Sequence, residues 1–143
     1  MTKEEKQLLL KDISARLPYG VKCRASYSKF PTTLVDVNVD ANVGDDFFIV
    51  TVKLEKTGLN SPSLIEDIRP YLRPMSSMTE EEIKEFRAFH CVDGLHPYFY
   101  QQMCNLQNLE NMFNWLNAHH FDYRGLIVKG LALEAPEGMY QNR

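Results

Sequence analysis

The first residues of the chain repeat apolar side chains at the spacing of a helix face. The apolar positions recur at intervals of three and four residues: Leu9, Leu10, Ile13 and Leu17. Thr2 stands before this stripe and Glu5 follows three residues later, which is the spacing of a capping box. Residues 18–20 read Pro-Tyr-Gly and supply a stop. The pattern predicts an amphipathic helix over residues 3–17 that packs on the body of the protein.

After this helix the apolar period changes from helical to alternating. In residues 34–41 and 47–56, apolar and polar side chains alternate, as they do in strands with one buried face. Residues 41–46 between them contain Gly and Asp, which suit a tight connection. We therefore expect a β-hairpin, with a further strand near 21–27 and a short one near 63–68. Three or four antiparallel strands leave a sheet face open, and the flanking helices would cover it.

The segment 69–74, RPYLRP, contains two prolines. Proline fixes its own φ and keeps the residue before it out of the helical region, so the segment predicts a stiff connector between two packed units. Thr79 and Glu82 have the spacing of a second capping box, and the acidic residues that follow Thr79 suit the positive end of a helix dipole. We predict a helix over residues 79–90.

The last third of the chain mixes aromatic, apolar and glycine-containing stretches. Residues 98–103, YFYQQM, are short and aromatic and predict an edge strand. A helix capped by Asn105 or Asn108 should follow, because apolar residues again repeat at three and four: Leu106, Leu109, Met112, Phe113 and Leu116. Trp115 lies close to this stripe, so packing is its expected role. Over residues 123–136 two glycines weaken a long helix, and we expect one short helical turn and then an extended tail.

Together these elements predict a single α+β domain that spans residues 1–143. A length of 143 residues falls within the usual size of one domain with one core. The N-terminal helix and a small, curled antiparallel sheet would form one unit, residues 1–74. Two helices and a short tail would form a mainly helical unit, residues 75–143, packed on the first.

Composition and charge narrow the class of protein without naming a partner. With 44% hydrophobic and 24% charged residues, the chain has the composition of a soluble globular protein. The formal net charge of −3 says little about partners, although residues 1–29 carry seven Lys or Arg against three acids. Signal-peptide character is missing at the N-terminus, and no stretch approaches the roughly 20 apolar residues of a membrane span. We expect a cytoplasmic protein without a membrane contact.

Three blocks of the sequence resemble segments of other proteins. They are LLLKDISARLPYGVKC (8–23), IRPYLRPMSSMTEEE (68–82) and NWLNAHHFDYRGLIVKGLALEAPEGMY (114–140). The chain resembles a group of short proteins from gut anaerobic bacteria, their prophages and mobile elements, for which no activity, cofactor or catalytic residue is established. The resemblance implies a small curled β unit between the first two blocks, and an SH3-like barrel is the fold that we expect for it.

Metal-ligand and nucleophilic residue types are present but poorly spaced. His90, Cys91, His96 and Cys104 form the one cluster with zinc-ligand chemistry, and they lack the CxxC or HxxxH spacing that places two ligands on one turn. The three cysteines, with Cys23, lie in no CxxC pair, which favours reduced thiols. Nucleophile-elbow, P-loop and dinucleotide motifs are missing. We therefore predict no cofactor, no metal and no catalytic residue.

Two groups of arginine and tyrosine residues are the best candidates for a binding surface. Arg69, Tyr71 and Arg73 stand on the proline-stiffened segment, and Tyr123 with Arg124 repeats the pairing. Tyrosine and arginine dominate protein interfaces, and a stiff backbone loses little entropy on binding. The same segment also has a structural interpretation, to which we give more weight. In it Tyr71 and Leu72 pack under a helix, and the arginines pair with Glu66, Asp67 or the acids at 80–82.

The sequence therefore predicts a non-enzymatic binding or adaptor protein of a phage or mobile element, with a protein as its partner. A nucleic-acid-binding accessory protein is the first alternative. It requires the basic residues of the first segment to converge on one face: Lys11, Arg16, Lys22, Arg24 and Lys29. A small thiol- or metal-dependent enzyme is the second alternative, and it requires His, Cys or Asp side chains to face one another in a cleft.

Overall fold

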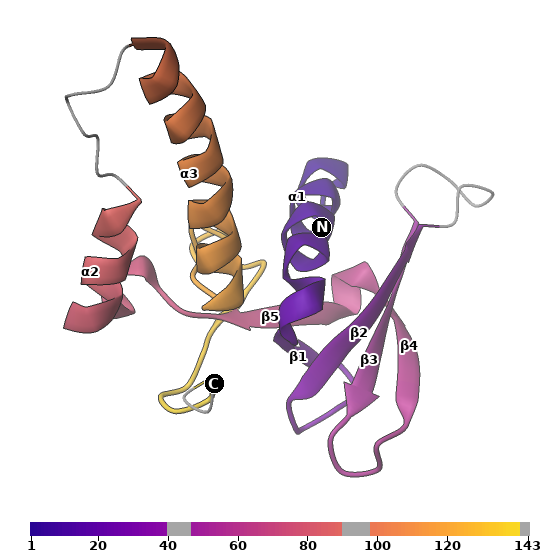
Figure 1. The fold of residues 1–143 in the computed structure, drawn as a ribbon. Coiled ribbons are helices and arrows are strands. Elements are labelled where there is room, and N and C mark those ends of the chain that lie inside the picture. Colours follow the sequence, from indigo (N-terminus) through magenta and orange to yellow (C-terminus); the bar gives the residue numbers. More distant parts are fainter. Residues whose placement is uncertain (40–46, 90–97, 141–143) are drawn as a thin grey trace.

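The structure is a computed structural model that describes residues 1–39, 47–89 and 98–140, with the side chains of 98–105 outside the description. Three helices and six strands follow one another in the order α1 (Lys3–Arg16), β1 (Lys22–Ala25), β2 (Thr32–Val39), β3 (Phe48–Leu54), β4 (Asn60–Leu64), β5 (Ile68–Leu72), α2 (Glu80–Ala88), α3 (Tyr98–Ala118) and β6 (Leu133–Glu134). The α+β class that the sequence predicts is confirmed (Figure 1).

The six strands form one open sheet in the order β4-β3-β2-β1-β5-β6. All neighbours are antiparallel except β5 and β6, which are parallel. Strands β4 and β6 are the two edges of this order, so the strand pairings do not close and the expected SH3-like barrel is not confirmed. The sheet also has more strands than the three or four that we expected. The hairpin of β2 and β3 agrees with the prediction, whereas its connection, residues 40–46, lies outside the described residues.

The proline-containing segment is a strand, which corrects the prediction of a connector over 69–74. Strand β5 buries Ile68, Pro70 and Leu72 and leaves the two side chains between them half-buried, so its period is two. Pro70 stands opposite Cys23 of β1, while β6 pairs only with the two residues after it. A proline cannot donate to a ladder, and this one lies where one side of the strand has no strand neighbour in the described part of the chain.

The helices begin where the local signals place them, with one exception. Thr2 and Glu5 cap α1, and Thr79 and Glu82 cap α2, each with both hydrogen bonds of a capping box. Helix α2 extends to Ala88, and the predicted end at His90 lies outside the described residues. The edge strand predicted at 98–103 is wrong, because these residues are the first turns of α3, and Asn105 and Asn108 are interior helix positions and not caps. Aromatic β-propensity is a weak preference that a long helix overrides.

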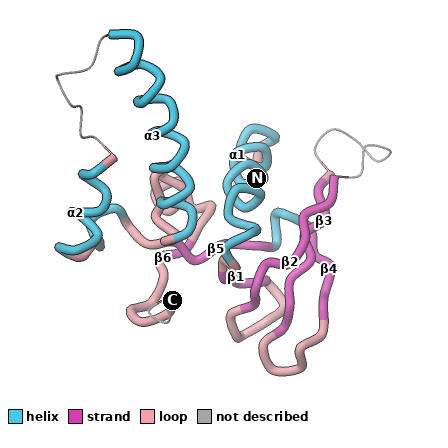
Figure 2. The backbone as a smooth tube through the Cα atoms, in the orientation of Figure 1, coloured by secondary structure: helices cyan, strands magenta, loops and turns pink. Residues whose placement is uncertain are grey.

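The core lies between α1 and the sheet. Leu9 and Ile13 of α1 join apolar side chains of the sheet, including Val50, Val52 and Ile68, in one buried cluster. Helices α2 and α3 lie on the other side of β5 from the β2–β3 hairpin (Figure 2). No residue of α2 is buried. Along the side chains described in α3, the predicted stripe is mostly exposed, since only Leu116 of it is buried.

The residues after α3 turn repeatedly before the chain becomes extended. Residues 123–130 form turns and not a helix; the Gly130 N–H donates to the Ile127 carbonyl at 3.0 Å, and Gly125 and Gly130 each have a φ of 73°. The two residues of strand β6 agree with the expected extended tail, whereas residues 137–140 turn again. Within the described ranges, none of the helices combines the length and the apolar character that crossing a membrane requires.

Candidate functional site

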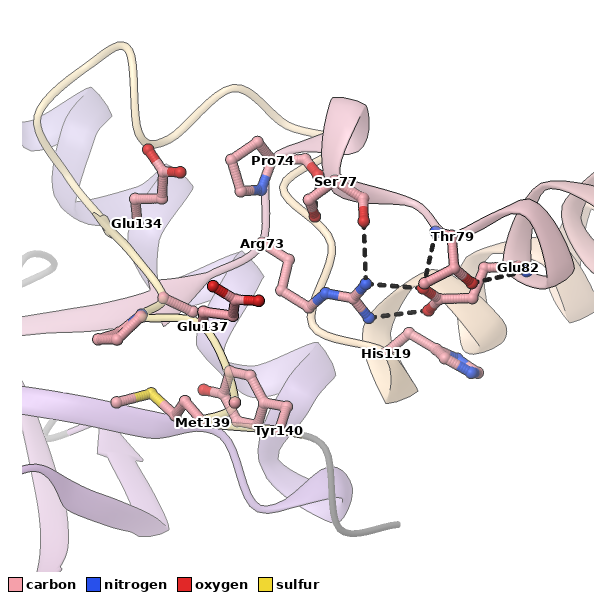
Figure 3. Close-up of a pocket in the computed structure, with 13 residues that line it drawn as sticks. Arg73, Pro74, Ser77, Thr79, Glu82, His119, Glu134, Glu137, Met139 and Tyr140 are labelled. Carbon is pink, nitrogen blue, oxygen red and sulfur yellow. Dashed lines mark hydrogen bonds and ion pairs between the residues drawn. The ribbon is translucent and has the colours of Figure 1, made fainter.

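A pocket of about 600 Å³ lies between the start of α2 and the segment of residues 134–140 (Figure 3). One wall comes from the end of β5 and the residues that lead into α2: Arg73, Pro74, Ser77, Thr79 and Glu82. The other wall is the C-terminal segment from Glu134 to Tyr140, and His119 at the end of α3 completes the lining. Helix ends and loops build the pocket, and they come from chain segments that lie far apart in the sequence.

Arg73 fixes the wall that leads into α2. Its guanidinium donates two hydrogen bonds to the Glu82 carboxylate, at 2.8 and 2.7 Å, and a longer one of 3.3 Å to the Ser77 carbonyl. The guanidinium carbon lies 4.2 Å from the centre of the Phe121 ring, within the range of a cation–π contact. The Arg73 backbone also donates to His120 and accepts from Asp122. One residue therefore connects β5, α2 and the turn after α3.

Glu82 holds a negative charge at the first turn of α2. The hydrogen bond from Arg73 is the main reason that its pKa falls from 4.5 to about 2, and hydrogen bonds from Thr79 add to it. The Thr79 hydroxyl in turn accepts from the Glu82 backbone N–H, while the Glu82 carboxylate accepts from the Thr79 N–H. The carboxylate is thus ionised at neutral pH and is already bound by an arginine and by the helix cap.

The C-terminal wall is held to the sheet by hydrogen bonds. The Tyr140 hydroxyl donates to the Tyr71 carbonyl of β5 and accepts from the Lys22 backbone N–H of β1, both at 2.9 Å. Its ring stacks on His120 at a centroid distance of 3.8 Å. The Ala135 N–H donates to the Leu72 carbonyl at 2.7 Å. These contacts with strands β1 and β5 and with His120 after α3 fix the wall at both of its ends.

The structure does not bring the five predicted binding residues together. Of the five, Arg73 alone has its place in the pocket lining. Arg69 donates to the backbone carbonyls of Glu66, Ile68 and Gly130. Tyr71 contributes its carbonyl to the Tyr140 hydroxyl, as described above. Both arginines therefore make internal contacts, as the structural interpretation predicts. Arg73 pairs with a carboxylate of the 80–82 group, whereas Arg69 binds backbone carbonyls in place of carboxylates.

Tyr123 and Arg124 belong to a second, buried network on α1. Asp12 and Arg16 are fully buried and form a bidentate pair, with Arg16 Nε and Nη2 at 2.9 and 3.0 Å from the carboxylate. Arg16 also donates to the Phe121 carbonyl at 2.7 Å, and Arg124 donates to Asp12 at 2.8 Å. The Tyr123 ring contacts both arginines. This network joins the first helix to the turn after the last one.

Trp115 joins α2 to α3, which confirms the packing role that the sequence predicts. Its indole N–H donates to the Glu85 carboxylate at 2.9 Å. Its ring lies next to an aromatic group from both helices and the following turn: Phe86, Phe89, His119 and Phe121. Helix α2 has no buried residue, and this aromatic group and the Arg73–Glu82 pair both hold it beside the pocket.

Cys23 is not suited to nucleophilic chemistry. Its side chain is fully buried in the core, and burial, helped by the nearby Asp12 charge, raises the pKa of the thiol from 9.0 to about 12. The four residues with zinc-ligand chemistry fall outside the description: this holds for all of His90, Cys91 and His96 and for the side chain of Cys104. Within the described part, no three metal-ligating side chains converge.

We expect Cys23 to resist alkylation for as long as the protein is folded. A thiol with so high a pKa is almost entirely protonated at pH 8, and the thiolate is the reactive form. Treatment with iodoacetamide at pH 8, followed by residue-resolved mass spectrometry, should show modification of Cys23 only as fast as the protein unfolds. The same reaction in 6 M guanidinium chloride should be fast and is the control. Equal rates in both conditions would show that the core is open at this position.

The basic residues required for the nucleic-acid alternative do not all reach the surface. Arg16 is fully buried with its charge bound to Asp12. The Lys22 ammonium forms an ion pair with Glu55. Two of the five cations are therefore engaged within the protein.

Sequence reasoning missed the C-terminal wall and the buried ion pair for different reasons. Asp12 and Arg16 carried a usable signal, because they alternate with Leu9 and Ile13 along the same helix face. Glu134 and Glu137 carried none, since only the folding of the chain brings them opposite α2. The chain matches none of the protein-family models, curated proteins or solved structures with which it was compared.

Proposed function

We propose that this chain is a non-enzymatic adaptor that binds a short segment of a partner protein in the pocket between α2 and residues 134–140. The pocket volume of about 600 Å³ carries this proposal, because it falls within the range of sites that enclose ligands. On the resemblance of its three sequence blocks, the adaptor would belong to a phage or mobile element and act in the cytoplasm.

The walls of the pocket support a preformed site. The bidentate bond from Arg73 to Glu82 holds the wall before α2, and the Tyr140 hydroxyl holds the opposite wall to β1 and β5. A site held in this way loses little conformational entropy when it takes up a ligand. In this proposal Arg73 shapes the contact surface. Arg69, Tyr71, Tyr123 and Arg124 support the surrounding scaffold through the internal contacts described above.

A selection from a random dodecapeptide phage-display library on the purified chain tests the proposal. We expect enriched peptides to bind the wild-type chain and to bind Ser77→Trp at least about tenfold more weakly, as measured by fluorescence anisotropy. Ser77 is exposed and lines the pocket, so an indole at this position would fill the pocket from its rim. The hydrogen bond that Ser77 accepts from Arg73 uses its backbone carbonyl and remains available.

Ser76→Trp is the matched control. Ser76 is the neighbouring serine, it is also exposed, and it is not part of the lining. Binding to this variant should equal that of the wild type. Peptides that bind the wild type and Ser77→Trp alike, or a selection without enrichment, would show that the pocket is not the contact site.

A further inference from the structure

We infer that the pocket accepts a basic side chain, lysine or arginine, from the partner segment. This inference rests on the proposed function and names the chemistry of its ligand. The cavity itself, and not the acidic residues alone, is the site. The charges of its lining and the partners that those charges already have decide which ligand it takes.

The ionisable lining of the pocket is unbalanced toward negative charge. The ionisable residues of the lining are one arginine, Arg73, and three glutamates, Glu82, Glu134 and Glu137, which leaves a formal charge of 1 − 3 = −2 with His119 counted as neutral. Arg73 and Glu82 neutralise each other in their bidentate pair. Glu134 and Glu137 are exposed and form no ion pair within the described residues. The excess charge is therefore available to a ligand.

An anionic ligand would find its usual binding groups occupied. A helix N-terminus attracts anions through its free N–H groups, but at α2 the Thr79 hydroxyl and the Glu82 carboxylate form the cap. The Arg73 guanidinium is turned toward Glu82 and away from Glu134, as Figure 3 shows, and its hydrogen bonds go to Glu82 and Ser77. An incoming carboxylate or phosphate would have to displace Glu82, whereas a cation needs no displacement.

The remaining lining suits the long stem of a basic side chain. Pro74, Pro136, Met139 and Tyr140 contribute apolar and aromatic surface between the charged groups. Lysine and arginine bury their methylene groups against such surface while the charged end stays near polar groups. A basic side chain can therefore contact both the apolar part and the acidic part of the lining.

Two pairs of peptide pools test the inference. The pools are fluorescein-labelled pentapeptides, acetylated and amidated, with random flanks around a fixed central residue. One pair compares arginine with citrulline, and the other compares lysine with norleucine, so that each pair differs in charge and hardly in size. With the wild-type chain we expect the charged pool to bind about fivefold or more tightly than its neutral partner at low salt, with the ratio shrinking as salt is added.

Removing the acidic groups should remove this preference. In the variant Glu134→Gln with Glu137→Gln, charged and neutral pools should bind alike. The control, Glu80→Gln with Glu81→Gln, loses the same charge from exposed positions outside the lining and should keep the ratio. Equal binding of charged and neutral pools to the wild type, still blocked by Ser77→Trp, would overturn the inference and leave the proposed function standing. Binding that Ser77→Trp does not weaken would overturn both.

Discussion

Replacing Asp12 with alanine should lower the free energy of unfolding by about 3–5 kcal/mol, which is the usual cost of breaking a buried ion pair from one side. Arg16 would keep its charge in a fully buried position, and among the described residues the Phe121 carbonyl would be the one acceptor left to its side chain. Arg124 would lose the same partner, although it is partly exposed and water can solvate it. Urea denaturation followed by circular dichroism measures the change.

Two further variants separate the buried charge from general effects of substitution. Asp36→Asn removes an exposed carboxylate from β2 and should change stability by no more than about 0.5 kcal/mol. Asp12→Leu combined with Arg16→Met removes both charges, so it should be less destabilising than Asp12→Ala alone. A loss below about 1 kcal/mol for Asp12→Ala would contradict the assigned network.

Replacing Arg73 with methionine should lower the free energy of unfolding by about 2–3 kcal/mol. The substitution removes the bidentate hydrogen bonds to Glu82 and the cation–π contact with Phe121, and it leaves a mostly buried carboxylate without its cation. Arg87→Met, at an exposed position near the end of α2, is the matched control and should cost about 0.5 kcal/mol or less. Urea denaturation of both variants against the wild type gives the two values.

The dependence of stability on pH provides the signature of this pair. Because the pKa of Glu82 is lowered to about 2 in the folded protein, its charge stabilises the fold above the unfolded value near 4.5. That stabilisation is lost as the pH falls from about 4.5 to about 2. The stability gap between the wild type and Glu82→Gln should therefore narrow over this interval. A gap that stays constant would assign the effect to shape rather than to charge.

Local signals predicted the helix starts because their causes are local. A capping box needs only a hydroxyl and a carboxylate three residues apart, so Thr2 with Glu5 and Thr79 with Glu82 define their helices without any distant contact. The alternating pattern of β2 and β3 is local in the same sense. Both the spacing of a capping box and the alternation of apolar and polar residues can be read directly from the sequence.

The errors concern residues whose state depends on distant partners. The strand β5 contains Pro70, and its period of two was hidden by a residue that usually excludes a strand. The turns at 98–103 are helical although their aromatic residues favour a strand in isolation. The pocket depends on such partners throughout, because Glu82 and Glu137 are 55 positions apart along the chain. The residue type of Arg73 was enough to make it a candidate for the site, but the sequence did not show which residues surround it.

The network between α1 and the turn after α3 has a consequence for how the protein is made. Arg16 donates to a carbonyl 105 positions further along the chain, and the backbone N–H of Lys22 in the following strand β1 donates to a hydroxyl 118 positions further along. A nascent chain that has left the ribosome only as far as β5 holds the acidic and basic groups of its first helix but not the residues that complete their contacts. We therefore expect synthesis to be nearly finished before the first helix reaches its final, stable position, and fragments of the first half should not be stable when expressed alone.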